Sequence, residues 1–247
     1  MVVRRHAFLP VLLVAVGAPA AQDPAPRHLA PEHLLDWERA SAPRLAPTGD
    51  RLVFTRSWVD KVADRWRSEL WLARRDGTRP RFLTEGSGAR WSPDGTRVGF
   101  LREGKPRGSQ IHVMWLDTRE VTQITRVDES PGDLRWSPDG TRLAFSMNVP
   151  ESQRVLKIDL PKAPKGAKWA EEPKIITRLS YRRDGSGYRP QGWRHLFVVD
   201  AEGGTPRQVT TGDFDHRRPE WSPDGAKLWF SGLRRDDADW QVRESEI

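Results

Sequence analysis

Short runs of alternating apolar and polar residues recur along this chain, each directly after the same turn sequence. Three copies of the pentapeptide Trp-Ser-Pro-Asp-Gly occupy residues 91–95, 136–140 and 221–225, and the runs follow at 96–100, 141–145 and 226–230. A period of two residues predicts a β-strand, with Leu143 and Phe145 on one face and Arg142 on a more polar one. Pro, Asp and Gly fit successive positions of a type I turn, so the pentapeptide predicts a hairpin corner.

These corners repeat at a nearly constant spacing. A less regular copy spans residues 45–54, so that successive copies begin 46, 45 and 85 residues apart, the last close to two ordinary periods. Repeats of about 40 to 50 residues built from short strands are typical of β-propeller blades. The long interval leaves open whether a degraded fifth copy lies near residues 177–181. The sequence therefore predicts an all-β propeller with four to five recognisable blades in a partial or incomplete ring.

A second set of strands recurs in phase with the corners. Residues 68–72, 110–113 and 195–200 have strand patterns, and each is followed by a polar turn and a further strand, at 81–84, 122–125 and 207–210. Every repeat thus supplies several strands joined by turns, as a propeller blade requires. We expect the Trp of each pentapeptide to pack between neighbouring blades.

The segments outside the repeats differ in composition. Residues 1–20 place basic residues before a short apolar run and then small residues, which predicts a secretory signal peptide and a periplasmic or secreted protein. Residues 21–44 are predicted to form a linker and a short helix from Pro31 to Arg39, and residues 45–247 to form the blades. No later run approaches the roughly 20 apolar residues of a membrane helix, so no integral membrane segment is expected after signal removal.

Two further features concern the blades themselves. Residues 149–172 carry many Pro, Gly and Lys, which indicates an exposed insertion between strands. Residues 245–247 align with 68–70, at the start of a strand, so we expect the blades to be incomplete at the C-terminus. The chain has no Cys, and its stability is therefore expected to come from packed sheets rather than from disulfides.

The net charge of +7 and the twelve Trp residues raise the possibility of nucleic-acid binding. The basic residues are, however, spread over every repeat, and the Trp residues fall at repeated packing positions. The one Lys-rich block, residues 162–174, is broken by Pro. Nucleic acid is therefore not an expected partner.

Motifs for catalysis or metal binding are missing from the sequence. Ser87 and Ser186 stand between two Gly residues at the wrong spacing for a nucleophile elbow, which needs Gly-x-Ser-x-Gly. The acidic clusters at 213–216 and 236–239 and the pair at 171–172 are interpreted as solvated turn and loop residues. No two of His28, His33, His112, His195 and His216 have the spacing of a ligand pair. We therefore assign no catalytic residue, metal or cofactor, and substrate-binding residues stay unknown.

The order of elements resembles a known family. The chain resembles the amino-terminal propeller of prolyl oligopeptidase family serine peptidases, especially the acylaminoacyl-peptidase and dipeptidyl-peptidase-like members. The resemblance lies in the order of the corner at 45–49, the strand at 68–72, the pentapeptide at 91–95 and the stretch 178–188 before the strand 195–200. The resemblance covers residues 30–247. The pentapeptide is also found in TolB and other propellers, and the order of elements around 181–200 carries the rest.

This resemblance implies a substrate-gating propeller in an exported peptidase that acts on peptides. In that family a carboxy-terminal α/β-hydrolase domain supplies Ser, Asp and His, and this chain has no counterpart, so the chain alone is not expected to be catalytic. The paired Glu at 171–172 stands in a different context from the amine-binding Glu pair of dipeptidyl-peptidase relatives. The alternative is a TolB-like periplasmic scaffold that binds a protein partner, although the first repeat already begins by Leu45, where TolB-like proteins have a separate preceding domain.

An open ring would expose unpaired strand edges to other chains. We therefore predict that the segment expressed alone is poorly soluble, which sedimentation velocity can measure. A sharp monomeric peak together with a cooperative thermal transition would contradict this prediction.

Overall fold

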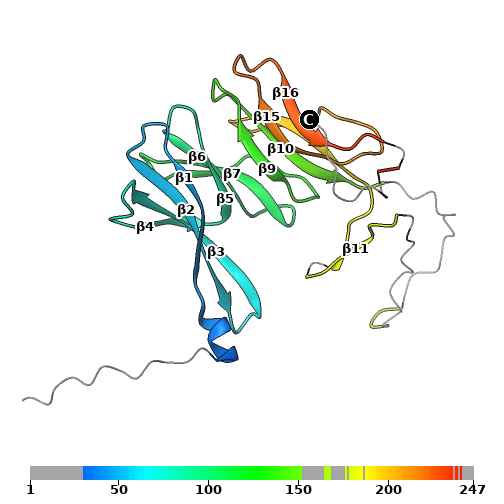
Figure 1. Cartoon of the computed structure of the whole chain (residues 1–247), viewed down its shortest axis with the longest axis horizontal. Coiled ribbons are helices and arrows are strands. Elements are labelled where there is room, and N and C mark those ends of the chain that lie inside the picture. The colour runs from blue at the N-terminus through cyan, green and yellow to red at the C-terminus, as the bar shows by residue number, and fades with distance from the viewer. Residues whose placement is uncertain are drawn as a thin grey trace, which may run out of the picture. The chain divides into compact units, whose positions relative to one another are not determined.

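The computed structural model describes residues 30–151, 164–167, 176, 178–185, 187–235, 237–238 and 240. Within these residues the regular structure consists of β-strands and one short 3-10 helix, η1 (Pro31–Asp36) (Figure 1). The predicted all-β class is confirmed, and η1 lies inside the range in which a helix was expected. The predicted signal peptide at 1–20 and the segments 171–172 and 245–247 lie outside the described residues.

The strands form antiparallel sheets that follow one another along the chain as propeller blades. Blade 1 consists of β1 (Arg39–Leu45), β2 (Arg51–Asp60), β3 (Arg65–Arg74) and β4 (Arg81–Glu85), and blade 2 of β5 (Ser87–Trp91), β6 (Arg97–Glu103), β7 (Ser109–Trp115) and β8 (Val121–Gln123). Blade 3 consists of β9 (Gly132–Trp136), β10 (Arg142–Val149), β13 (Trp193–Asp200) and β14 (Arg207–Gln208). The described part of blade 4 consists of β15 (His216–Trp221) and β16 (Leu228–Gly232). The second set of predicted strands is confirmed as the third and fourth strands of blades 1 to 3. The strand β1 was not predicted.

The 85-residue interval is explained by an insertion within blade 3. Strands β10 and β13 pair along their whole length, from Arg142 opposite Asp200 to Val149 opposite Trp193. All the extra residues therefore lie between the second and third strands of one sheet, where an insertion was predicted at 149–172, but the connection extends further, from 150 to 192. Its described part includes a small hairpin of β11 (Arg182–Arg183) and β12 (Gly187–Tyr188), and the optional fifth repeat near 177–181 is therefore not a separate blade.

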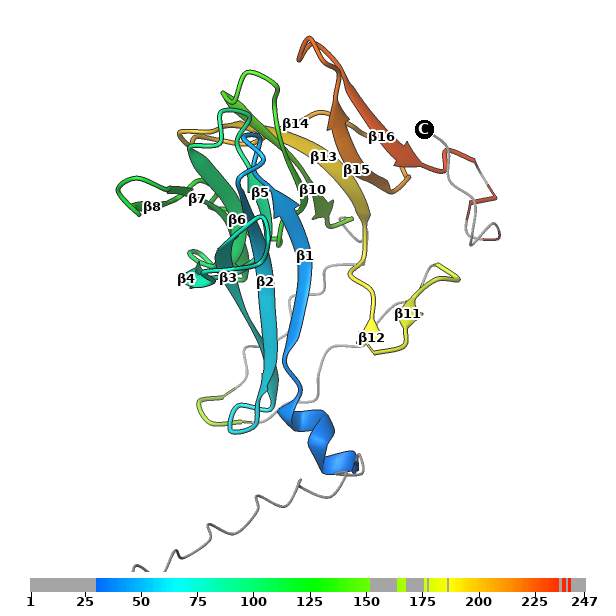
Figure 2. The same cartoon turned by 60° about the vertical axis from the view of Figure 1, so that its left-hand side comes forward.

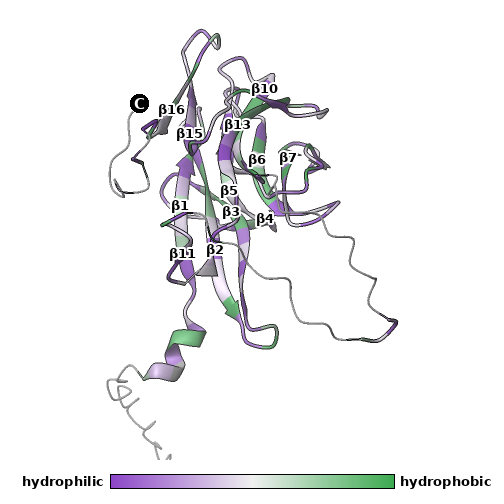
Figure 3. Cartoon of the chain, turned by 90° about the vertical axis from the view of Figure 1, so that its right-hand side faces the viewer, coloured by the Kyte–Doolittle hydropathy of each residue, from purple (hydrophilic) through white to green (hydrophobic). Residues whose placement is uncertain are grey.

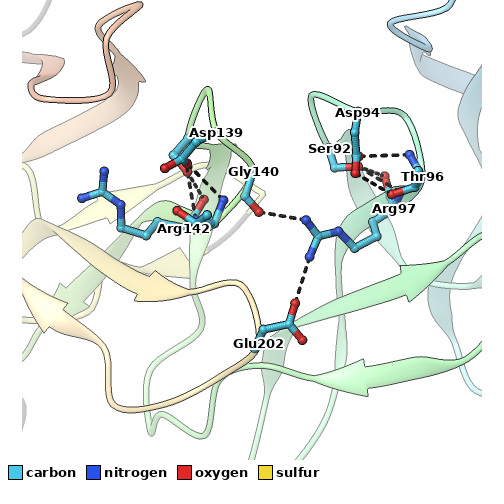
Figure 4. A network of polar contacts seen from close by, with 10 residues as sticks. Ser92, Asp94, Thr96, Arg97, Asp139, Gly140, Arg142 and Glu202 are labelled. Carbon is cyan, nitrogen blue, oxygen red and sulfur yellow. Dashed lines mark hydrogen bonds and ion pairs between the residues drawn. The ribbon is translucent and has the colours of Figure 1, made fainter.

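Each pentapeptide forms the predicted corner between the first two strands of a blade. In blade 2, the hydroxyl of Ser92 donates to Asp94 at 2.5 Å and accepts the backbone N–H of Arg97 at 2.9 Å (Figure 4). The corners at Ser137 and Ser222 repeat both bonds at the same distances. The final Gly of each corner has a positive φ of 68° to 71°, a conformation that favours Gly. The corner is therefore fixed by its own side chains.

The hydrophobic core lies between blades. One cluster joins Val53 and Leu70 of blade 1 to Val98 and Phe100 of blade 2, and a second cluster joins blades 2 and 3. The two faces of β10 are unequal, since Arg142 is half-buried, but Ala144 on the face of Arg142 is fully buried like Leu143 and Phe145 on the other face. The reason is that a blade is covered by another sheet on both faces, so its middle strands need apolar residues at consecutive positions. Figure 3 shows hydrophobic residues interrupted by hydrophilic ones along the strands.

Neighbouring blades are joined by a repeated contact, which we call the blade latch. It consists of the Arg that follows one corner, the Trp that begins the next corner, and a carbonyl of that next corner. Between blades 2 and 3, the guanidinium of Arg97 lies 4.9 Å from the ring centre of Trp136. The same guanidinium donates to the carbonyl of Gly140 at 2.9 Å (Figure 4). Arg142, Trp221 and Gly225 repeat this geometry between blades 3 and 4. The predicted packing of Trp between blades is confirmed.

The blade latch leads to a prediction about stability. Replacing Arg97 by Ala removes a cation–π contact, a charge-assisted hydrogen bond and the 3.0 Å ion pair with Glu202. We expect the free energy of unfolding to fall by about 2 kcal/mol, measured by urea denaturation. The matched control is Arg207→Ala on the exposed outer strand β14, with an expected change below about 0.5 kcal/mol. Equal losses in the two variants would show that the latch does not stabilise the blade interface.

Candidate functional site on the inner strands

The first strand of each blade contacts the first strand of the next. Strand β1 contacts β5, beside which it lies in Figure 2, and β5 contacts β9, which contacts β15. The fourth strands make no comparable contact among the described residues. Because blades are arranged radially, the strands that meet from blade to blade are those closest to the axis. We therefore call β1, β5, β9 and β15 the inner strands.

Every inner strand carries the same irregularity. Two of its residues lie opposite a single residue of the second strand, which is the geometry of a β-bulge. The first bulged residue has a positive φ in all four blades: Ala42 (50°), Gly88 (66°), Asp133 (53°) and Arg218 (52°). A bulge changes the direction of the side chains that follow it. The repetition shows that the inner strands are built to present one position in the same way in each blade.

That position is occupied by Arg in three consecutive blades. The position directly after the bulged pair is occupied by Arg44, Arg90 and Arg135 in blades 1 to 3, and by Glu220 in blade 4. We call the three Arg residues the arginine ladder. The indoles of blades 2 and 3 bind the ladder backbone of the preceding blade, since Trp91 donates to the carbonyl of Arg44 at 2.8 Å and Trp136 to that of Arg90 at 3.0 Å. The indole N–H of Trp221 in blade 4 has no hydrogen-bond partner among the described residues. These bonds hold consecutive ladder residues beside one another.

Charge on the ladder is only partly neutralised. Arg135 forms a 2.5 Å ion pair with Glu220 on the next inner strand. Arg90 donates to the carbonyl of Ala89 and, like Arg44, has no ion pair with any described residue. Burial, together with the charges of Arg135 and Arg44, lowers the pKa of Arg90 to about 10. The carboxylates of Glu220 and Asp133 act in the opposite direction but have smaller effects. The residue remains charged at neutral pH, at some electrostatic cost.

The inner strands as a whole are strongly basic. They carry six Arg residues and two acidic residues, namely Arg39, Arg44, Arg90, Arg135, Arg217 and Arg218 against Asp133 and Glu220. Asp133 is already engaged, because it accepts hydrogen bonds from Ser146 at 2.8 Å and from the backbone N–H of Arg218 at 3.4 Å. The inner surface can therefore attract anionic groups.

A second polar cluster lies between blades 3 and 4. The rings of His195 and His216 approach with 3.3 Å between their Nδ1 atoms, and Arg234 donates to Nε2 of His216 at 3.1 Å. Burial lowers the pKa of His216 to about 4, and the charges of Arg234 and His195 act in the same direction. Burial also lowers the pKa of His195. Both rings are therefore neutral at pH 7, and no sequence spacing indicated that they would meet.

Asp215 differs from the solvated turn residue that was expected at 213–216. Its carboxylate accepts hydrogen bonds from the backbone N–H of Arg194 at 2.9 Å and from the side chains of Arg189 at 3.1 Å and Arg217 at 3.0 Å. Burial alone would raise the pKa of Asp215, but the hydrogen bonds from Arg194 and Arg217 outweigh it and lower the pKa. Asp215 thus ties the inserted segment to two strands.

The remaining sequence candidates lie apart from one another. Ser87 is in β5, and His112 is buried in the core, where its ring stacks on Phe100. Ser186 lies outside the described residues. Within the part of the chain that the structure describes, no group of three His, Asp or Glu residues could hold a metal ion.

A cleft of about 560 Å³ opens where blade 1 meets blade 2. It is lined by Trp58, Trp66 and Arg67 of the long β2–β3 hairpin and by Arg102 and Glu103 of blade 2, among others. The hairpin wall is itself held by stacking, since Arg39 lies 4.9 Å from the ring centre of Trp66. The lining mixes charges of both signs with aromatic rings, which suits a polar, extended ligand better than an apolar one.

Comparison with known proteins identifies the family. The TolB beta propeller domain family matches residues 46–242. This chain belongs to that family. Among curated relatives, it is 28% identical over 202 residues to the uncharacterized peptidase YuxL of Bacillus subtilis, covering 79% of this chain and 30% of the relative. It is 29% identical over 114 residues to dipeptidyl-peptidase 5 of Porphyromonas endodontalis, covering 44% of this chain and 16% of the relative.

Solved structures agree on the fold. The acylaminoacyl peptidase of Pyrococcus horikoshii superimposes with a TM-score of 0.59 at 16% identity, covering 82% of this chain and 29% of that one. The expected relationship to the propellers of acylaminoacyl and dipeptidyl peptidases is therefore confirmed. The chain spans less than a third of the length of these relatives and corresponds to their propeller portion. Among its described residues, no helix has the length and apolar character needed to cross a membrane.

The His195–His216 pair predicts a dependence of stability on pH. The pKa of His216 falls from an ordinary 6.5 to about 4 on folding, so between these values the unfolded chain binds a proton that the folded chain does not. Stability from this residue is complete above pH 6.5 and is lost as the pH falls to 4, by up to about 3 kcal/mol. Urea denaturation at a series of pH values should show a smaller loss for His216→Gln. An unchanged pH dependence in that variant would contradict the assignment.

Proposed function

We propose that this chain is the substrate-gating propeller of an exported serine peptidase that acts on peptides. The observation that carries the proposal is the relationship to the peptidase YuxL over 79% of the chain. The predicted signal peptide at residues 1–20 supports export. In this proposal the nucleophile, acid and base belong to a hydrolase domain outside this chain.

The geometry suits such a role in two ways. Blades closed by latches form a rigid wall, which would admit an unstructured peptide and exclude a folded protein. The inner strands present charged side chains at repeated positions, which would hold a peptide in an extended orientation near the reacting groups. Both effects act on substrate entry rather than on the chemical step, so they would change the choice of substrate.

Hydrolysis is the direct test of the peptidase assignment. The chain joined to its natural downstream sequence should hydrolyse chromogenic dipeptide or acyl-amino-acid substrates, and replacing the nucleophilic Ser of the downstream elbow by Ala should abolish this activity. A protein that has the elbow but hydrolyses none of these substrates would overturn the peptidase assignment. It would then favour a TolB-like scaffold that binds a protein partner, the other kind of protein that carries this propeller.

Gating is tested separately by narrowing the inner surface. The chain has no Cys, so Arg90→Cys introduces one labelling site in it, and a bulky polyethylene glycol maleimide attached there should lower kcat/KM for a peptide by about tenfold or more. The smallest chromogenic substrate should be less affected. The same label at Arg207→Cys, on the outer strand β14, is the matched control and should leave both rates unchanged. Equal effects at the two sites would contradict entry along the inner strands.

A further inference from the structure

The arginine ladder contains an internal comparison. At its blade 4 end the guanidinium of Arg135 is neutralised by the carboxylate of Glu220 at 2.5 Å. At the equivalent places beside Arg44 and Arg90, the next inner strand presents another Arg instead of a carboxylate. Two neighbouring pairs of the ladder, Arg44 with Arg90 and Arg90 with Arg135, therefore bring like charges together, whereas Arg135 forms an ion pair with Glu220. This ion pair shows that a carboxylate is the chemical group that a ladder guanidinium binds.

We infer that the arginine ladder binds the carboxylates of acidic peptide segments, with Arg44 and Arg90 as the principal contacts. A guanidinium presents parallel N–H donors that match the two oxygens of a carboxylate. A carboxylate beside each pair of like charges would relieve the repulsion between neighbouring guanidinium groups as well as form its own hydrogen bonds. This inference rests on the proposed function, and it specifies acidic peptides as the substrate class.

Carboxylates on a peptide fit the ladder better than phosphates on a nucleic acid. Nucleic-acid sites of this kind pair basic residues with aromatic rings on which bases stack. Here the ring of Trp136 is buried under Arg97, and the ring of Trp91 lies 5.7 Å from the guanidinium of Arg51. These indoles are therefore engaged between blades and are not platforms for bases. The positions left over for a ligand are the ladder side chains.

The ladder residues are also accessible. Arg44 is exposed and Arg90 half-buried, and their backbone carbonyls, not their guanidinium groups, are the atoms bound by the Trp of the next blade. Replacing Arg90 by a neutral residue would remove a repulsive charge while leaving the carbonyl bond in place. The variant should therefore be at least as stable as the parent protein, which separates a loss of binding from a loss of structure.

Direct binding tests the inference without requiring hydrolysis. The chain is joined to its natural downstream sequence, with the nucleophilic Ser of the downstream elbow replaced by Ala, and is titrated into a fluorescein-labelled hexaglutamate peptide at low salt. Fluorescence anisotropy is compared with that of hexaglutamine and hexalysine peptides. We expect binding of hexaglutamate only, weakened by added NaCl. Arg90→Gln and Arg44→Gln should each weaken it about tenfold, and the charge reversal Arg90→Glu should abolish it. The matched control Arg207→Gln should change the affinity by less than about twofold.

The possible outcomes separate clearly. Equal binding of hexaglutamate and hexaglutamine, or an unchanged affinity in both ladder variants, would overturn the inference. A single-stranded oligonucleotide of equal charge that binds as tightly as hexaglutamate would also overturn it and indicate a general polyanion surface. Loss of binding accompanied by a lower melting temperature in Arg90→Gln would contradict the ladder as a site of repulsion. Peptide hydrolysis plays no part in this titration, so a failure of the peptidase assignment would be seen separately.

Discussion

The stacking of one guanidinium on the Trp of the next blade is the contact on which the rest of the structure depends. Consecutive sheets around an axis are connected by the chain but share no hydrogen-bonded ladder, so their relative positions are set mainly by side chains. Arg97 and Trp136 supply such a contact, with a backbone carbonyl of the neighbouring corner as a third partner. The corner sequence thus has two roles. It closes a hairpin in its own blade, and its Trp ring and Gly carbonyl bind the Arg of the previous blade.

Much of the fold could be predicted because the repeat encodes it locally. The pentapeptide contains its own turn chemistry, and the strands after it show a period of two, so corners and strand order followed from single positions such as Pro93 and Gly95. The insertion in blade 3 was harder to place, since pairing of β10 with β13 depends on partners far apart along the chain. The strand β1 was missed because its exposed residues alternate in no recognisable way.

The candidate site was largely invisible in the sequence. The bulges place the non-Gly residues Ala42, Asp133 and Arg218 at positive φ. Their residue types do not predict this backbone conformation. The residue before each Trp could be noted as charged, but only the contacts between inner strands bring Arg44 beside Arg90 and Arg90 beside Arg135. His195 and His216 meet for the same reason, across two blades. The arginine ladder and the His pair are thus formed by contacts between residues far apart in the sequence, which local sequence propensity does not predict.

The repeated bulge also limits how this propeller can change over evolution. The corner bonds between Ser92 and Arg97 fix Trp91 opposite Val98. Removing one residue from the bulge of β5 would therefore turn Ser87, before the bulge, toward the opposite face, because successive side chains of a strand alternate. Exchanging a side chain at the same place would leave the register intact. Insertions and deletions should therefore collect in connections such as that between β10 and β13, while the inner strands keep their length and vary mainly in charge. Related propellers could in this way acquire different ligand preferences on one unchanged backbone.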